Sequence, residues 1–426
     1  MHGVGEAYPP RMADTAALRQ LAAFTAELYR AKVSLGYQGY VRHDELALLM
    51  LHPGRDNPYP LYERLRERGP LTRSRVGQWV TTSHRTCNAV LRDRRFGVVL
   101  DGEQGPGMGG LSFLEMNPPD HTRLRRLAAP AFSPKKMAGY TALIEKTVQR
   151  LLDDLPKDGP FDLVADFSAP LPIAVISDLL GVPTARADEF ARWGATIGTA
   201  LDGVKGVRHL TALMKANAGL EQLFGLLFEQ RRKDPAEDVI STLVAAEGET
   251  ISPAEMLLIC VLLFIAGFET TVNLISNGVM ALLAHPEQWA ALHADPSLAG
   301  AAVEEVLRYD PPVQRTGRVA LVDTELEGVA LHRGEYVVTL TGAANRDPAV
   351  YDEPGRFDIS RKPSVEHLAF SSGIHYCLGA PLARAEATIA LAALAERLPR
   401  LRRAGRVVRR NASTIRGPLR LPVAVS

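Results

Sequence analysis

Apolar positions recur with helical spacing over the middle of the chain, from Pro118 to Tyr309, and proline and glycine turns divide this part into separate helices. The longest predicted helix runs from about Ser252 to Ala284. Ser252 and Glu255 form a capping box at its start, with Pro253 in the first helical position. A helix of this length spans roughly 50 Å. Because it is apolar on most sides, we expect it to cross the whole domain and to be buried.

The pattern changes on both sides of this helical part. Residues 56 to 83 predict a helix followed by two short strands, and residues 316 to 340 predict several short strands with turn residues between them. Residues 343 to 376 are rich in Pro, Asp and Gly, which predicts an irregular, packed segment. A strong helix follows over "LGAPLARAEATIALAALAERL", and the end of the chain alternates enough for a small hairpin. The chain is therefore predicted to be mainly α-helical with small β-sheets.

Two segments fall outside this scheme. Residues 1 to 50 form an N-terminal extension, helical over "TAALRQLAAFTAELYRAK", which we expect to pack on the main domain. Residues 97 to 117 contain too many glycines for a regular element and predict a mobile loop, a feature that is often functional in a compact domain. No repeat or low-complexity linker divides the remainder. We therefore predict a single domain over residues 51 to 426.

Composition and charge limit the function classes. The 426 residues are 46% hydrophobic and 23% charged, an ordinary globular composition, and the net charge of +1 argues against a dedicated nucleic-acid binder. The N-terminus lacks the pattern of a signal peptide. The longest apolar run, Met256 to Phe268, is too short to span a bilayer and leads into Glu269. We expect a monomeric, cytoplasmic protein without a membrane or nucleic-acid partner.

One of the three cysteines is a candidate ligand. Cys87, Cys260 and Cys377 lie too far apart for a disulfide framework or a zinc site, and a lone cysteine is most often a small buried hydrophobe. Cys377 differs because in "FSSGIHYCLGAPLAR" it follows a Ser/Gly-rich turn and directly precedes a helix. Amide donors and the helix dipole at that position favour a thiolate. Such a thiolate suits a metal centre, and haem iron needs only one protein ligand.

The long helix carries a second candidate in "AGFETT", Ala266 to Thr271. Glu269 in this apolar setting is costly without a partner or a role, and Gly267 weakens the helix where Thr270 can divert a backbone bond. A local opening there would hold a ligand or water, and the two polar residues could relay protons. The alternative is that Thr270 only satisfies its own helix carbonyl and that Glu269 lies at the surface.

Two further charged patterns have both a structural and a functional interpretation. Glu305 and Arg308 are one helical turn apart and can pair, although most such pairs are solvated and contribute little. His121 and Arg125 share one helix face and could bind an anion, or could belong to a solvated basic helix. The G-x-G-x-x-G match at residues 105 to 110 leads into no helix, so a dinucleotide site there is rejected.

Taken together and in this order, the motifs resemble those of the cytochrome P450 family, from about Asn57 to the C-terminus. "FSSGIHYCLG" is similar to the family's haem-binding loop, and "AGFETT" is similar to its oxygen-activation segment. The resemblance implies the cytochrome P450 fold, a helical domain around haem with small β-sheets, and haem b as the cofactor. Ser371 departs from the pattern, because the family usually has Gly at this position.

The resemblance also implies a role for each motif residue. Cys377 would be the thiolate ligand of the iron, with Gly379 at the start of the helix behind it, and Glu269 and Thr270 would deliver protons. Positions that hold the haem propionates are matched by His121, Arg125, Arg318 and His375. A structural triad under the haem loop would consist of Glu305, Arg308 and Arg356.

The implied activity is that of a haem-thiolate monooxygenase, which activates O2 and hydroxylates or epoxidises a small organic substrate. Natural-product tailoring, of a polyketide or a peptide, is the expected context. Oxidative coupling, or another oxidation without oxygen insertion, stays open, and a non-enzymatic haem-binding sensor is less favoured. The substrate pocket would be lined by Phe96, Leu111, Phe113, Ala266 and Val313.

Electrons are expected to come from a separate protein, because the chain contains no flavin or nicotinamide domain. By analogy with the family, the donor would be a ferredoxin with its reductase, which draws electrons from NAD(P)H. A basic face could receive an acidic ferredoxin. The residues predicted for that face are Arg123, Arg126, Lys135 and Lys136.

Overall fold

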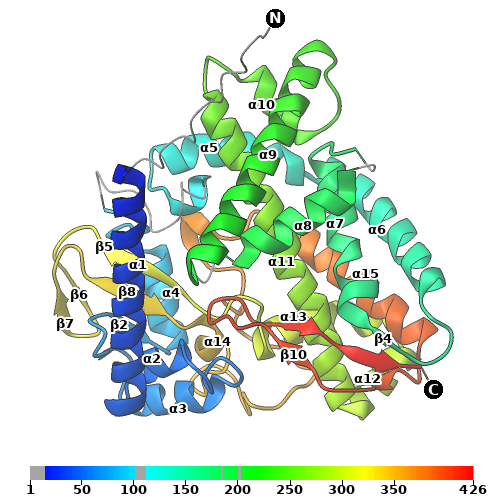
Figure 1. Ribbon diagram of the computed structural model, residues 1–426. Coiled ribbons are helices and arrows are strands. Elements are labelled where there is room, and N and C mark those ends of the chain that lie inside the picture. Colours follow the sequence, from blue (N-terminus) through cyan, green and yellow to red (C-terminus); the bar gives the residue numbers. More distant parts are fainter. Residues whose placement is uncertain (1–14, 101–111, 184–185, 200–202, 426) are drawn as a thin grey trace, which may run out of the picture.

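The helical part of the molecule is built around α11 (Pro253–Ala284), a 32-residue helix. The computed structural model describes residues 15–100, 112–183, 186–199 and 203–425 (Figure 1). The predicted capping box is present: the Glu255 N–H donates to Ser252 Oγ at 3.3 Å, and the Ser252 N–H donates to Glu255 Oε2 at 2.9 Å. The predicted long helix is therefore confirmed, with Pro253 at its first position.

Among the described residues, α11 is the one helix long and apolar enough to cross a membrane, and 78% of its most apolar window is buried inside the molecule. It packs against α7, α8, α13 and α15. The helices before it are α1 (Thr15–Gly36), α2 (Glu45–Leu49), α3 (Tyr59–Glu67), α4 (His84–Arg92), α5 (Asp120–Ala128), α6 (Pro134–Asp154), α7 (Pro170–Leu179), α8 (Ala187–Gly198), α9 (Val207–Lys233) and α10 (Val239–Ala245). Those after it are α12 (Pro286–Ala294), α13 (Ala299–Tyr309), α14 (Thr341–Ala344) and α15 (Ala380–Arg397).

Small sheets lie beside the helical part (Figure 1). In the five-stranded sheet, β2 and β8 are parallel and the other neighbours antiparallel. Its strands, in spatial order, are β1 (Thr72–Arg73), β2 (Trp79–Thr81), β8 (Tyr336–Thr339), β5 (Thr316–Ala320) and β3 (Phe96–Gly97). The other strands are β4 (Pro160–Asp162), β12 (Pro422–Ala424) and β9 (Arg402–Arg403), the pair β6 (Thr324–Leu326) and β7 (Val329–Leu331), and the pair β10 (Val408–Arg409) and β11 (Pro418–Arg420). The prediction of a mainly helical chain with small sheets is confirmed.

The described part of the N-terminal extension divides in two. Tyr29 and Val33 on α1 are 58% and 72% exposed, whereas Leu46 and Leu49 on α2 are buried in a core cluster with Leu61 of α3. Polar contacts also connect this segment to the rest of the chain: the Lys32 ammonium donates to the Lys205 carbonyl at 2.6 Å, and the Tyr40 hydroxyl donates to the His52 carbonyl at 2.8 Å. That residues 1–50 as a whole form an extension packed on the main domain stays a prediction.

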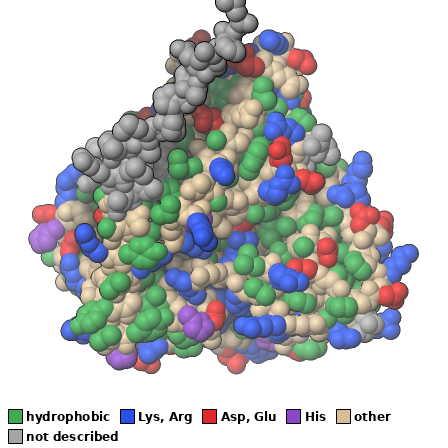
Figure 2. Space-filling model, viewed as in Figure 1, with side chains coloured by type: hydrophobic (Ala, Val, Ile, Leu, Met, Phe, Trp, Pro, Cys, Tyr) green, Lys and Arg blue, Asp and Glu red, His purple; other side chains and the backbone are tan. Residues whose placement is uncertain are grey.

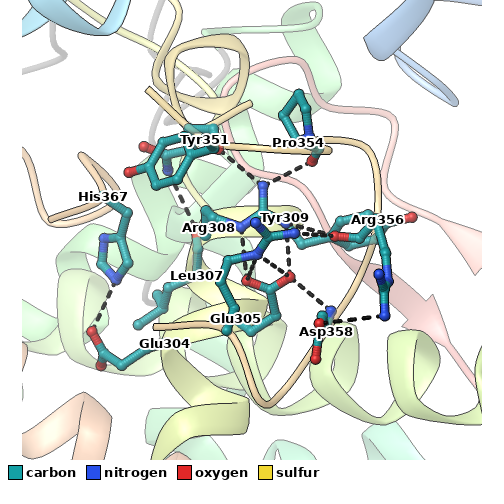
Figure 3. A network of polar contacts seen from close by, with 12 residues as sticks. Glu304, Glu305, Leu307, Arg308, Tyr309, Tyr351, Pro354, Arg356, Asp358 and His367 are labelled. Carbon is teal, nitrogen blue, oxygen red and sulfur yellow. Dashed lines mark hydrogen bonds and ion pairs between the residues drawn. The ribbon is translucent and has the colours of Figure 1, made fainter. Parts of the chain in front are cut away.

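A buried ion pair on α13 connects it to the irregular segment after α14 (Figure 3). Arg308 Nε and Nη2 each donate to a carboxylate oxygen of Glu305 at 2.7 Å, and both side chains are almost fully buried. Arg308 also donates to the carbonyls of Pro354 and Arg356, at 2.8 and 2.9 Å. The solvated-pair interpretation is wrong here, because both side chains are buried and Arg308 also donates to backbone carbonyls of the neighbouring segment.

The third member of the predicted triad needs a correction. The Arg356 side chain is 58% exposed and contacts Glu353 and Asp358 rather than Glu305. Its carbonyl, not its guanidinium, faces Arg308. Arg361 Nε lies 3.4 Å from Glu305 Oε2 and occupies the place that the prediction gave to Arg356. The backbone turn that aims the Arg356 carbonyl at Arg308 leaves its side chain at the surface (Figure 3).

We expect Arg361→Ala to lower the free energy of unfolding clearly more than Arg356→Ala does. An exposed substitution away from such a network usually changes stability by less than about 0.5 kcal/mol. Arg308→Met should cost about 3–5 kcal/mol or prevent folding, because it leaves the Glu305 carboxylate buried without its main partner. Denaturant unfolding monitored by circular dichroism measures all three. An Arg356→Ala variant as unstable as Arg361→Ala would contradict the corrected assignment.

Candidate active site

The loop before Cys377 is shaped by two residues with positive φ. Gly373 has φ +68°, and a Cβ there would lie 2.5 Å from the Leu91 carbonyl oxygen at the end of α4, so only glycine fits. Ser371 has φ +64°, a conformation that costs a residue other than glycine about 1–2 kcal/mol. The Cys377 N–H donates to the Phe370 carbonyl at 2.9 Å and closes the loop. The structure thus accepts Ser371 in a conformation suited to glycine.

Cys377 is accessible, whereas Cys87 and Cys260 are buried. The interpretation of Cys377 as a core hydrophobe is therefore wrong. Protein still surrounds the thiol closely enough for burial to raise its pKa. The backbone N–H groups of Gly379 and Ala380 and the guanidinium of Arg125 oppose that rise. The amide donors alone do not produce a thiolate, but a coordinated metal ion would deprotonate the sulfur.

The predicted propionate-binding residues gather next to this thiol. The rings of His121 and His375 lie 4.4 Å apart between centroids, and Arg125 Nη2 donates to the Tyr376 carbonyl at 2.6 Å. Burial, followed by the charges of Arg318, His121 and Arg125, lowers the pKa of His375 to about 3. Burial also lowers the pKa of Arg318 to about 10. The structure therefore brings together all four residues that the sequence pattern proposed.

These four residues keep donors that the protein itself does not use. Within the described chain, both ring nitrogens of the buried His121 have no hydrogen-bond partner. Arg125 and Arg318 donate to backbone or hydroxyl oxygens, at Tyr376, Gly317 and Thr316, rather than to carboxylates. Buried cations and orphaned donors are costly unless an anion compensates them. Two propionates beside a thiolate-bound iron fit this donor set.

Most of α11 is buried, but one of its turns is accessible to solvent. Ala266 is exposed and Thr270 is half-buried, while the neighbours Phe268 and Thr271 are buried. The Thr270 hydroxyl donates to the Ala266 carbonyl at 2.6 Å, as the alternative interpretation expected. The predicted local opening is absent, because α11 is continuous through this turn. Gly267 instead allows α7 to approach, since a Cβ there would lie 3.1 Å from Ile176.

Glu269 is buried rather than at the surface, with 1% of its area exposed. Its carboxylate forms an ion pair with Arg410, which follows β10. Gly198, at the end of α8, makes room for it: a Cβ there would lie 3.1 Å from the carboxyl carbon. Arg410 was missed by sequence reasoning, because nothing in "RVVRRNAS" indicates which arginine reaches α11.

The predicted pocket residues differ in their burial and in their contacts. Phe96 is buried between Val90, Ala320 and Val337 in the core under the sheet, so its assignment to the pocket is corrected. Phe113 is buried with its ring edge toward His121, at 6.4 Å between centroids. Val313 is half-buried and forms a backbone bridge with Ile415. Ala266 is exposed on α11, and Leu111 lies outside the described residues.

Comparison with known proteins decides the family. The family model "Cytochrome P450" matches residues 208–398, which include Glu269, Arg318 and Cys377. The "Biotin biosynthesis cytochrome P450" of Bacillus subtilis is 39% identical over 356 residues, which cover 81% of this chain and 90% of that protein. The chain belongs to the cytochrome P450 family. This P450 is therefore an oxidoreductase of a haem-binding monooxygenase family.

Other members of the family agree with this placement. The "Nocardicin C N-oxygenase" of Nocardia uniformis is 38% identical, over 88% of this P450 and 96% of that enzyme. The solved structure of the Bacillus subtilis bacillaene polyketide synthase cytochrome P450 PksS is 34% identical, with a TM-score of 0.81 over 89% of this P450 and 99% of that chain. The predicted P450 fold is confirmed, and relatives of this P450 act in natural-product biosynthesis.

Proposed function

We propose that this P450 binds haem b through Cys377 and inserts one oxygen atom of O2 into a small natural product, by hydroxylation or epoxidation. The observation that carries the proposal is the set of Arg125, Arg318 and two histidines beside the accessible thiol, with both ring nitrogens of His121 unpartnered among the described residues. The names of the nocardicin and bacillaene relatives support a peptide or polyketide as the substrate class.

The proposed roles follow from the contacts of each residue. Haem, when bound, supplies the activation of dioxygen, which thiolate ligation favours. Cys377 would hold the iron, and the N–H groups of Gly379 and Ala380 would stabilise negative charge on its sulfur. His121, Arg125, Arg318 and His375 would hold the propionates and so orient the group.

Proton delivery is assigned to Thr270 and Glu269. The Thr270 hydroxyl lies at the accessible turn of α11 and must turn away from the Ala266 carbonyl to donate elsewhere. Glu269 is paired with Arg410, so proton delivery through it requires that contact to loosen.

We expect Thr270→Ala to uncouple electron use from product formation, with several-fold more peroxide formed per NAD(P)H oxidised. Removing the hydroxyl removes the proton donor at the accessible turn, and proton transfer by a placed side chain contributes about 10²–10⁴-fold. Thr270→Ser keeps the hydroxyl and is the matched control, with coupling close to that of the unchanged protein. Peroxide and product are measured in the same reaction.

Labelled dioxygen in that reaction separates the reaction types. Incorporation of label into the product supports oxygen insertion, whereas an oxidised product without label would support oxidative coupling. Unchanged coupling in Thr270→Ala would show that the relay assignment is wrong.

We propose a ferredoxin with its reductase as the electron donor. We also propose that the protein acts in the cytoplasm, so fractionation of cells should recover it in the soluble fraction.

The predicted basic face is smaller than the sequence indicated. Arg123 is paired with Asp120 and Glu255, at 2.9 and 2.6 Å, and Lys136 is paired with Glu237 at 3.0 Å. Arg126 and Lys135 of the predicted face remain exposed, and the exposed Arg92 lies against Gly373 in the loop before Cys377.

Reduction by an acidic ferredoxin should therefore slow down as ionic strength rises, because salt screens the attraction between exposed charges. The double variant Arg126→Gln/Lys135→Gln should be reduced several-fold more slowly at low salt and should show a weaker salt dependence. Arg123→Gln is the control, since its charge is already compensated. Stopped-flow reduction rates measure the effect, and a rate that does not change with salt would rule out this face.

A further inference from the structure

A small cavity lies beside Glu269, on the side of α11 that faces the turn between β10 and β11. Its volume is about 50 Å³, enough for a group the size of a carboxylate. Gly198 at the end of α8 contributes to one wall, and the turn after β10 contributes another. The ionisable residues in its lining are Lys205, Glu269 and Arg410.

Arg410, which lines this cavity, keeps a donor without an acceptor among the described residues. One guanidinium nitrogen, Nη1, pairs with Glu269. The Nε–H group is buried and has no hydrogen-bond partner among the described residues, although only 13% of the side chain is exposed. A buried donor without an acceptor costs about 1–3 kcal/mol. A guanidinium can serve two carboxylates at once, since it carries five N–H donors in a planar fork.

Positive charge surrounds the turn that carries Arg410. Lys205 Nζ donates to the Asn411 carbonyl at 3.0 Å, Arg55 Nη1 contacts Asn411 Oδ1, and Lys32 Nζ donates to the Lys205 carbonyl. The segments 203–209 and 410–416 contain four Lys or Arg residues and no Asp or Glu. Figure 2 shows Lys and Arg side chains over the middle of this face, where α9 approaches the C-terminal hairpin. A positive field of this kind draws anions toward the cavity.

The cavity adjoins the predicted substrate pocket. Ile415 in its lining forms a backbone bridge with Val313, one of the predicted pocket residues. Glu269 precedes Thr270, whose turn of α11 is accessible. A substrate placed against Ala266 and Thr270 could therefore extend one end toward Arg410.

We propose that Arg410 binds a carboxylate of the substrate, so that this P450 selects organic acids over their neutral analogues. The inference rests on the proposed function, because it places the substrate in the pocket above haem. Arg410 then bridges two carboxylates, Glu269 through Nη1 and the substrate through Nε. Because one guanidinium then serves both carboxylates, substrate binding is connected to the acid that is assigned to proton delivery.

The test is a titration of haem-loaded protein with matched acids and neutral analogues, followed through the shift of the iron spin state. The probes are dodecanoic acid against methyl dodecanoate, and phenylbutanoic acid against phenylbutanamide. We expect the acids to bind at least about tenfold more tightly, since hydrogen bonds to charged groups contribute about 1.5–3 kcal/mol. Arg410→Gln should abolish the preference, and Arg410→Lys should keep part of it.

Arg410→Gln alone removes the ion-pair partner of the buried Glu269 carboxylate and can therefore destabilise the fold. The double variant Glu269→Gln/Arg410→Gln removes both charges and controls for this effect. It should also lack the preference. Lys215→Gln is the matched control: Lys215 is an exposed cation on α9 that does not line the cavity. Equal affinities for acid and analogue, a preference that survives in the double variant, or no spectral response to any acid would overturn the inference. If the acid preference is missing but the same haem-loaded protein still gives a thiolate spectrum, the haem assignment stands and only the inference about Arg410 fails.

Discussion

The active-site region depends on cationic and hydrogen-bonding groups that no carboxylate of the described chain compensates. Arg125, Arg318 and two histidines lie together beside Cys377, and the two arginines donate to backbone or hydroxyl oxygens rather than to carboxylates. Such a set is unfavourable on its own, because buried cations lose hydration without gaining a partner. Folding energy from the large apolar core around α11 sustains it. The arrangement has its physical explanation when a dianionic group binds there.

Two neighbouring residues of α11, Glu269 and Thr270, lie in different surroundings. Thr270 belongs to the accessible turn with Ala266, whereas Glu269 turns into a buried ion pair with Arg410. Two glycines make this possible: Gly267 admits α7 against the helix, and Gly198 leaves space for the Glu269 carboxylate. The same helix therefore presents a hydroxyl at an accessible turn and a buried, ion-paired acid at the residue before it.

Much of the framework was predictable from local sequence. The capping box of Ser252 and Glu255 marks the start of α11, and the loop around Gly373 and Cys377 has a composition that only a tight turn before a helix explains. These features depend on backbone conformation and spacing within a few residues, and such information is present in the sequence itself.

The partners of the charged residues were not predictable in the same way. Arg361 rather than Arg356 reaches Glu305, although both follow the same proline-rich segment, because a backbone turn decides which side chain points inward. Arg410 reaches Glu269 across 141 positions (410 minus 269), and Phe96 belongs to the sheet core rather than the pocket. Each depends on tertiary packing between distant segments, which residue spacing does not encode.

The account's central claim is that Cys377 ligates haem iron as a thiolate. The absorption spectrum of the reduced, carbon monoxide-bound, haem-loaded protein tests it most directly, with Cys377→His as the comparison. We predict a strongly red-shifted Soret band for the unchanged protein and its loss in the variant, because thiolate donation to the iron is what shifts the band. A band without that shift in freshly prepared unchanged protein, or a shifted band that survives in Cys377→His, would contradict the assignment of Cys377.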